Sequence, residues 1–152
     1  MQNVETHLMT AWRALQIGLG LAAFLAGLDK FFNLLTDWTM YLSPLAESLL
    51  PVSGAVFMRL IGIVEMIVGI AILTSWTRLG AYVASVWLSL IAFNLLLTGL
   101  FLDVAVRDLE MALAAFTLAR LTEWREVVLS GDNEAVVREA AVPRDPRTFM
   151  ET

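Results

Sequence analysis

The chain has 152 residues, of which 59% are hydrophobic and 16% are charged, and its formal net charge is −5. A soluble domain is usually about 45–50% apolar and about 25% charged, so a chain of this size has too little interior to bury its apolar excess and needs a bilayer as solvent. The chain has no cysteine, which excludes disulfides, thiol chemistry and iron–sulfur clusters held by cysteines. Its single histidine, His7, excludes bis-histidine haem ligation within one chain. The acidic balance and the unclustered basic residues argue against a nucleic-acid partner.

Four apolar segments are long enough to cross about 30 Å of hydrocarbon as helices, which takes about 20 residues each. They cover residues 12–35, 52–74, 79–102 and 104–121. The third carries no charge, and the fourth carries charges over its first two turns. The sequence therefore predicts an all-α fold, a bundle of four transmembrane helices within a membrane domain of residues 1–122. We expect the first span to be retained and not cleaved as a signal peptide, because the segment before it is long and not strongly basic.

The connection between the first two spans, TDWTMYLSPLAESLLP, has aromatic and leucine residues at helical spacing. Ser43 followed by Pro44 is typical of a helix start, so we expect a short helix that lies in the membrane interface. After Leu121 the composition becomes polar. Residues 123–152 are predicted to form a cytoplasmic tail with a loop, a short helix capped at Asp132 and an extended end.

The basic residues predict the orientation, because arginine and lysine are enriched on the cytoplasmic side of membrane proteins. One side of the membrane would hold Arg13, Arg78, Arg120 and Arg125. The other side would hold Lys30 and Arg107, together with Asp37, Glu47 and Asp103. We therefore expect a multi-pass protein of the inner cell membrane with both termini in the cytoplasm.

Polar and small residues share one face of each of the first two spans. These residues are Arg13, Gln16, Gly20, Ala23, Gly27 and Lys30 in the first span and Gly62, Glu65 and Gly69 in the second. Small residues let another helix approach closely in lipid, so both faces are expected to point inward. Since neighbouring residues lie about 100° apart on a helix, Asp29 falls at the margin of this face. Lys30 either enters a pocket, which we favour, or extends to the membrane surface.

Polar side chains from all four spans fall at one level, in the outer half of the bundle. The candidate ligand-binding residues are Lys30, Arg59, Glu65, Asn94, Asp103, Arg107 and Glu110. On the fourth span, Asp103, Arg107 and Glu110 are expected to share one side. Asp108 is expected to point elsewhere, toward a headgroup or another helix, and Trp87 in the third span is expected to serve packing. A charge at mid-bilayer costs about 2.5–3.5 kcal/mol, so these groups must pair or face a cavity. Three interpretations follow: a salt-bridge network, a pocket for a ligand headgroup, or a carboxylate metal site. The metal site is the least favoured, because the cluster contains no histidine.

Three runs of sequence resemble the DoxX-like membrane proteins over about residues 11–122. They are GLGLAAFLAGLDK, preceded by Arg13, then GIVEMIVGIAIL around Glu65, and RDLEMALAAFTLARL in the last span. The resemblance implies a four-helix membrane bundle in quinone or redox company, since such relatives include the membrane subunit of thiosulfate:quinone oxidoreductase and accessory proteins of oxidative-stress complexes. The chain has no thiol to pass electrons from sulfur compounds, which argues against independent redox catalysis.

The sequence favours a non-catalytic accessory subunit of a larger membrane complex, with redox or electron transfer as its expected process. Its outer pocket would hold a lipid or quinone headgroup, its partners would be membrane lipids and other membrane subunits, and no cofactor would be covalently bound. The alternative is a DoxX-like, quinone-linked oxidoreductase subunit in which Glu65 or Glu110 donates protons. A transporter is disfavoured because no inverted repeat is visible and the inner half has few polar residues beyond Arg13 and Gln16.

Overall fold

The computed structural model describes residues 2–44, 48 and 50–141. Its elements are α1 (Gln2–Asp29), the short 3-10 helix η1 (Trp38–Tyr41), α3 (Gly54–Leu73), α4 (Thr77–Thr98) and α5 (Leu102–Ala141). No strand occurs among the described residues, and the prediction of an all-α fold is confirmed.

Three of the described helices are long and apolar enough to cross a membrane: α1 from Val4 onward, α3 and α4. Many of their large apolar side chains are exposed, as in Leu25, Ile67 and Leu97, which suits a surface that contacts acyl chains. The chain is therefore a membrane protein. α5 is not among the three because it carries charged residues close to its start, so a fourth crossing stays a prediction.

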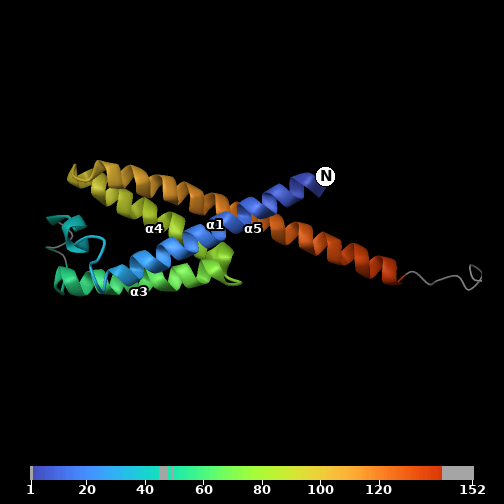
Figure 1. Ribbon diagram of the computed structural model, residues 1–152, viewed down its shortest axis with the longest axis horizontal. Coiled ribbons are helices and arrows are strands. Elements are labelled where there is room, and N and C mark those ends of the chain that lie inside the picture. The colour runs from blue at the N-terminus through green and yellow to red at the C-terminus, as the bar shows by residue number, and fades with distance from the viewer. Residues whose placement is uncertain (1, 45–47, 49, 142–152) are drawn as a thin grey trace, which may run out of the picture.

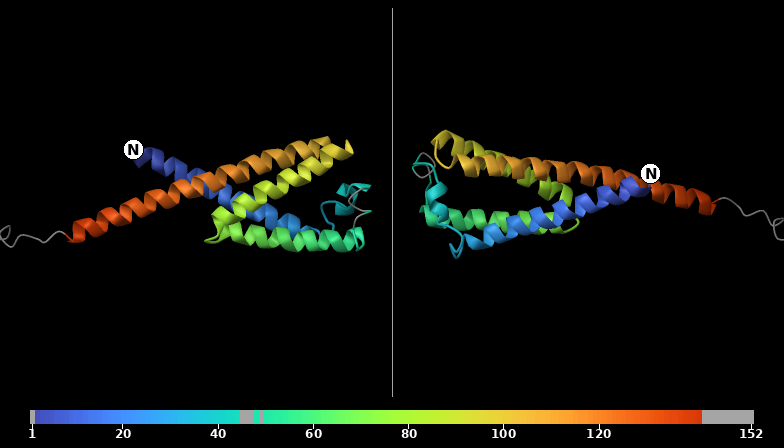
Figure 2. Two further views of the ribbon diagram at one scale, coloured as in Figure 1. Left: turned by 180° about the vertical axis from the view of Figure 1, so that it is seen from behind. Right: turned by 45° about the horizontal axis from the view of Figure 1, so that its top comes forward.

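The long helices form two antiparallel pairs, α1 with α3 and α4 with α5. The pairs lie apart where α1 ends and α3 begins, and they meet toward the other end, where α1 crosses α5 (Figures 1 and 2). η1 lies at the open end. We call this the η1 end, and we call the other, which holds the α3–α4 connection at residues 74–76, the turn end.

Glycines bring α1 and α3 into direct backbone contact. A Cβ atom at Gly27 would lie 2.5 Å from the carbonyl oxygen of Gly62, and one at Gly69 would lie 2.7 Å from that of Gly20. Real side chains do not tolerate such distances, so both contacts require glycine. The four glycines are buried, which confirms the predicted inward faces of the first two spans.

α4 and α5 pack against each other through small side chains. Buried alanines occur at positions 81, 84 and 92 of α4 and at positions 105, 112, 115 and 119 of α5. The largest fully buried side chains are Ile72, Leu95 and Leu118. This alanine-rich contact lets the two backbones approach closely and fixes which side of α5 faces the bundle.

α1 ends earlier than the sequence predicts. The apolar pattern predicts a span to residue 35, but the helix ends at Asp29. The Asp29 carboxylate accepts hydrogen bonds from the backbone N–H of Leu34 at 3.0 Å and of Leu35 at 3.2 Å. Asn33 has a left-handed φ of 51°, which a continuing helix does not allow. A side chain that competes for backbone N–H groups thus turns the chain after Asp29.

α5 is one helix of 40 residues, so the prediction of a loop and a separate short helix capped at Asp132 is wrong. The hydroxyl of Ser130 donates to the carbonyl oxygen of Glu126 at 2.8 Å, and Gly131 keeps a helical backbone. α5 also passes position 122 without a break. The extended end predicted for the tail, residues 142–152, lies outside the described residues.

The connections limit how far other predictions can be compared. Much of the interfacial helix predicted to begin at Ser43 and Pro44 lies outside the described residues, at 45–47 and 49. α4 ends at Thr98 and not at residue 102, because Gly99 adopts a left-handed φ of 66° that stops the helix. The other limits of α3 and α4 agree with the prediction within two residues.

Candidate functional site

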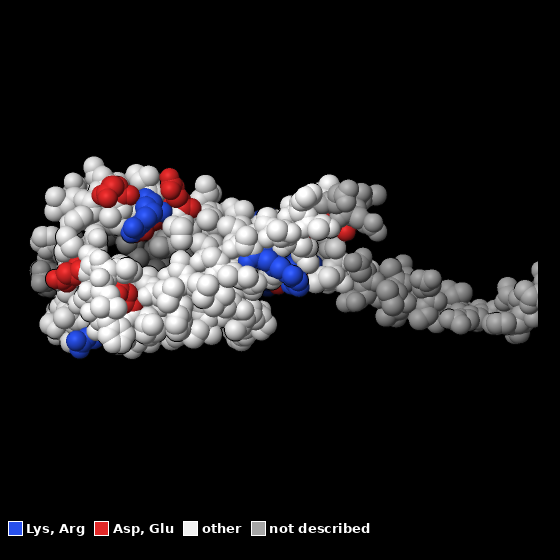
Figure 3. All heavy atoms as spheres, viewed as in Figure 1, with Lys and Arg blue, Asp and Glu red and all other residues white. Residues whose placement is uncertain are grey.

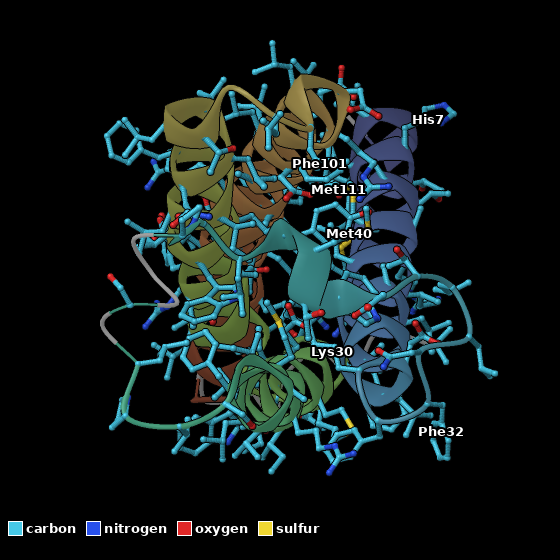
Figure 4. The ribbon with its side chains drawn as sticks, turned by 90° about the vertical axis from the view of Figure 1, so that its left-hand side faces the viewer. His7, Lys30, Phe32, Met40, Phe101 and Met111 are labelled. Atoms are coloured by element: carbon cyan, nitrogen blue, oxygen red, sulfur yellow. The ribbon has the colours of Figure 1, made fainter. Side chains whose placement is uncertain are left out.

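A cavity of about 580 Å³ lies between the two helix pairs. All four long helices and η1 contribute to its wall, and Figure 4 looks onto it from the η1 end, with η1 across the middle. The wall is largely apolar, with Leu19, Phe57, Ile61 and Leu88 among its residues, and it reaches as far toward the turn end as Ile72. Its volume falls within the range of about 300–1,000 Å³ that is usual for small-molecule sites.

Lys30 is the central polar group of the cavity, and its side chain points between the helices (Figure 4). Its Nζ lies 2.5 Å from Oε2 of Glu65 and 3.7 Å from the centroid of the Trp38 ring. The side chains of Lys30 and Glu65 are only 5% and 14% exposed. Neither charge is well solvated, so each depends on the other, and the indole face adds a cation–π attraction. The prediction that Lys30 enters a pocket is confirmed.

Asp29 and Lys30, the adjacent acid and base at the end of α1, have different roles. Its Oδ2 accepts a hydrogen bond from Trp38 Nε1 at 2.8 Å, in addition to those from the following backbone. This carboxylate therefore folds the chain back, and the indole ring comes to lie over Lys30. Tyr41 packs edge-on against Phe101 with ring centroids 4.9 Å apart, which joins η1 to the start of α5. Asp29 therefore holds Trp38 and η1 across the open end of the cavity, and we call this segment the cover. Lys30 points into the cavity itself.

Four of the seven candidate residues line the cavity, namely Lys30, Glu65, Asn94 and Arg107. Arg59, Asp103 and Glu110 have exposed side chains and do not line it. Arg107 is also 65% exposed, so it occupies the rim. Charged side chains gather over the start of α5, beside a hollow in the molecular surface (Figure 3).

Asp108 is a second carboxylate in the cavity wall. Of the two directions predicted for it, the structure has the one toward other helices and not the one toward a headgroup at the surface. Its side chain is 14% exposed, and its Oδ1 lies 4.0 Å from Nε of Arg107. It also lies within electrostatic range of Lys30 and Glu65. The charged side of α5 was expected to face the bundle, but a different side packs on α4. Buried alanines recur three and four residues apart around Asp108, so the alanine stripe, and not the charged side, faces the bundle.

Trp87 is a polar group that the sequence analysis missed. Its indole N–H is buried, and it makes no hydrogen bond with the described residues. It lines the cavity near enough to the Glu65 carboxylate to interact with it, but outside hydrogen-bond geometry. Buried donors are almost always paired, so this N–H calls for an acceptor, which is either the nearby Glu65 carboxylate or a group of a molecule bound in the cavity. A tryptophan in mid-span, away from the interfaces that the residue prefers, was the signal in the sequence.

Within the described part of the chain, no three histidine, aspartate or glutamate side chains come together in a way that could hold a metal ion. Comparison with known protein families, with curated proteins and with solved structures found no match. The resemblance to DoxX-like proteins therefore stays a prediction, and the function rests on the chemistry of the cavity.

Proposed function

We propose that the protein is a four-span membrane protein that binds an amphipathic molecule, a lipid or a quinone, in this cavity. The headgroup would lie at Lys30 and Trp87, and the chain would occupy the apolar remainder. The observation that carries this proposal is the unpaired, buried N–H of Trp87 beside the Lys30–Glu65 ion pair, in a wall that is otherwise largely apolar. One polar end and a long apolar body complement a ligand of the same shape.

The length and packing of α5 support its role as the fourth span. From Leu102 to Arg125 the helix rises about 34 Å, close to the thickness of the hydrocarbon core of about 30 Å. It packs along α4 through buried alanines, and most of its charges lie near the ends of this stretch. Arg13, Arg78 and Arg125 belong to the turn end, which favours a cytoplasmic turn end and an external η1 end in an inner cell membrane.

The polar groups favour a ligand that offers hydrogen-bond acceptors. Trp87 Nε1 is a donor only, the ammonium of Lys30 is a donor, and Asn94 can supply both kinds of group. The two ring carbonyls of a quinone are such acceptors, and so are the ester and phosphate oxygens of a lipid. Glu65 would keep the Lys30 ammonium oriented, because charge-assisted hydrogen bonds are short and directional.

A non-catalytic accessory subunit is the role that we favour within this proposal. The cavity provides binding groups, and the chain has no cysteine that could pass electrons. A quinone-linked oxidoreductase subunit is the second candidate, because Glu65 lies in the cavity wall where it could exchange a proton with a bound quinone. Electrons would then have to come from a partner subunit.

The proposal is tested by gentle purification from native membranes, followed by mass spectrometry of extracted lipids, quinones and co-purified proteins. We expect a stoichiometric quinone or phospholipid, and its amount should fall in the Trp87→Phe variant but not in Arg59→Gln, which changes an exposed residue outside the cavity. Equal occupancy in both variants would contradict a headgroup site at Trp87, and an empty original protein would contradict ligand binding. A stoichiometric partner supports the accessory role, and quinone turnover by the isolated protein would replace it with the enzymatic one.

A further inference from the structure

A second polar cluster lies at the turn end, where α1 crosses α5 (Figure 1). The guanidinium carbon of Arg125 lies 4.5 Å from the centroid of the Trp12 ring. The ring is itself held, because Trp12 Nε1 donates to the hydroxyl of Thr122 at 2.8 Å. Trp12 is 8% exposed and Thr122 is 4% exposed. The aromatic plane therefore gives Arg125 a fixed support.

Arg125 has no negative partner among the described residues. Its Nε is buried without a hydrogen bond, and no ion pair joins it to a carboxylate. The two nearest glutamates in sequence already have partners. Glu123 accepts from the hydroxyl of Tyr82 at 2.7 Å and pairs with Arg120, and Glu126 pairs with Arg78 at 2.8 Å. No carboxylate of the described residues therefore neutralises the positive charge of Arg125.

We propose that Arg125, supported by Trp12, binds the phosphate of an anionic phospholipid headgroup. A guanidinium presents N–H groups in a planar fork that matches two oxygens of a phosphodiester. Arg125 lies about 34 Å along α5 from Leu102, which puts it at headgroup level when Leu102 lies near the opposite surface. Arg13, next to Trp12 and exposed, adds a second positive charge on α1. The anionic lipids of a cytoplasmic leaflet attract such groups.

This inference uses the membrane topology proposed above, but it does not depend on a ligand in the cavity. The two sites lie at opposite ends of the bundle and share no residue, since neither Trp12 nor Arg125 lines the cavity. A variant at one site should therefore leave binding at the other unchanged. Failure of this inference is thus separable from failure of the cavity proposal.

The test is native mass spectrometry of the detergent-purified full chain with phosphatidylglycerol, phosphatidylcholine or inorganic phosphate added. We expect preferential retention of one phosphatidylglycerol, weakened about tenfold in Arg125→Gln, because the variant loses the charge-assisted hydrogen bonds of the guanidinium. Arg125→Lys keeps the charge but loses the fork, so it should be intermediate. Arg59→Gln makes the same charge change at the η1 end and should behave like the original protein.

Equal retention of phosphatidylglycerol by Arg125→Gln and Arg59→Gln would overturn the site. Protection from thermal unfolding by inorganic phosphate as strong as that by phosphatidylglycerol would overturn the lipid as its occupant and point to a free anion. Circular dichroism confirms that each variant is folded. If Arg125→Gln does not fold, Arg125→Lys decides, because retention equal to that of the original protein then excludes a role for the fork.

Discussion

The ammonium of Lys30 and the carboxylate of Glu65 meet at 2.5 Å because the glycines beside them let α1 and α3 touch. A Cβ atom at Gly62 would lie 3.1 Å from Cβ of Lys30 and 2.5 Å from the carbonyl oxygen of Gly27. Any side chain at these two glycines would push the helices apart. The glycine contact thus positions the ion pair of the proposed ligand site.

Replacing only one member of the ion pair should destabilise the protein strongly. Lys30→Met or Glu65→Met leaves the other charge buried without its partner, which costs about 3–5 kcal/mol. The double variant removes both charges and should lose much less than the sum of the two single losses. The free energy of unfolding, measured by titration with sodium dodecyl sulfate, checks this. Additive losses would show that the two groups do not stabilise each other.

Alanine at Gly27 should weaken the α1–α3 contact, whereas alanine at Gly18 should not. The new methyl group at Gly27 would overlap the backbone of Gly62, and overpacking of this kind costs about 1–3 kcal/mol. Gly18 is exposed with nothing within 4 Å of its Cβ position, so Gly18→Ala should stabilise helix α1 by up to about 1 kcal/mol. The same unfolding titration compares the two variants, and equal stabilities would refute the backbone contact.

Asn in place of Asp29 should loosen the cover of the cavity. The variant loses a charged acceptor that binds the backbone N–H of Leu34 and Leu35 and the indole of Trp38, so these three contacts weaken. Tryptophan fluorescence should shift to longer wavelength and become easier to quench with iodide. Glu110→Gln, at an exposed position, is the control and should keep the original spectrum. An unchanged spectrum in Asp29→Asn would contradict this role.

The cap of η1 should open in acid. The pKa of Asp37 lies below its usual value because the hydroxyl and the backbone N–H of Thr39 both donate to its carboxylate. A lowered pKa in the folded state means that the cap contributes fully above the unfolded pKa of about 3.9 and is lost as the pH falls through the folded value. As the pH falls, the amide hydrogen of Thr39 should therefore lose protection from exchange when Asp37 is protonated. The Asp37→Asn variant should not show this pH-dependent loss. The same loss in both proteins would assign it to another group.

The sequence predicted the parts of the structure that local patterns determine. Long, largely apolar runs marked α3 and α4 within a few residues, and glycines seven apart marked the sides on which α1 and α3 meet. Lys30 and Glu65 could be assigned to the interior because both continue those glycine faces. These features depend on helical periodicity alone.

The remaining features depend on contacts between segments. The end of α1 is set by Trp38 and by backbone groups that reach Asp29, which no run of apolar residues reveals. The inward side of α5 was misjudged because the helix has two plausible sides, one charged and one rich in alanine. Close packing on α4 selects the alanines and carries Asp108 inward. The unpaired N–H of Trp87 becomes visible only when its surroundings are known.

The most direct test of the account is to fill the cavity without changing any polar group. Ala26 lines the cavity, whereas Ala14 lies on the exposed surface of the same helix and does not. Phenylalanine at Ala26 should displace the lipid or quinone that co-purifies with the original protein, and phenylalanine at Ala14 should leave it bound. Mass spectrometry of solvent extracts measures both. Loss of the ligand in Ala26→Phe alone is the result that we predict, and equal amounts in the two variants would contradict binding in the cavity.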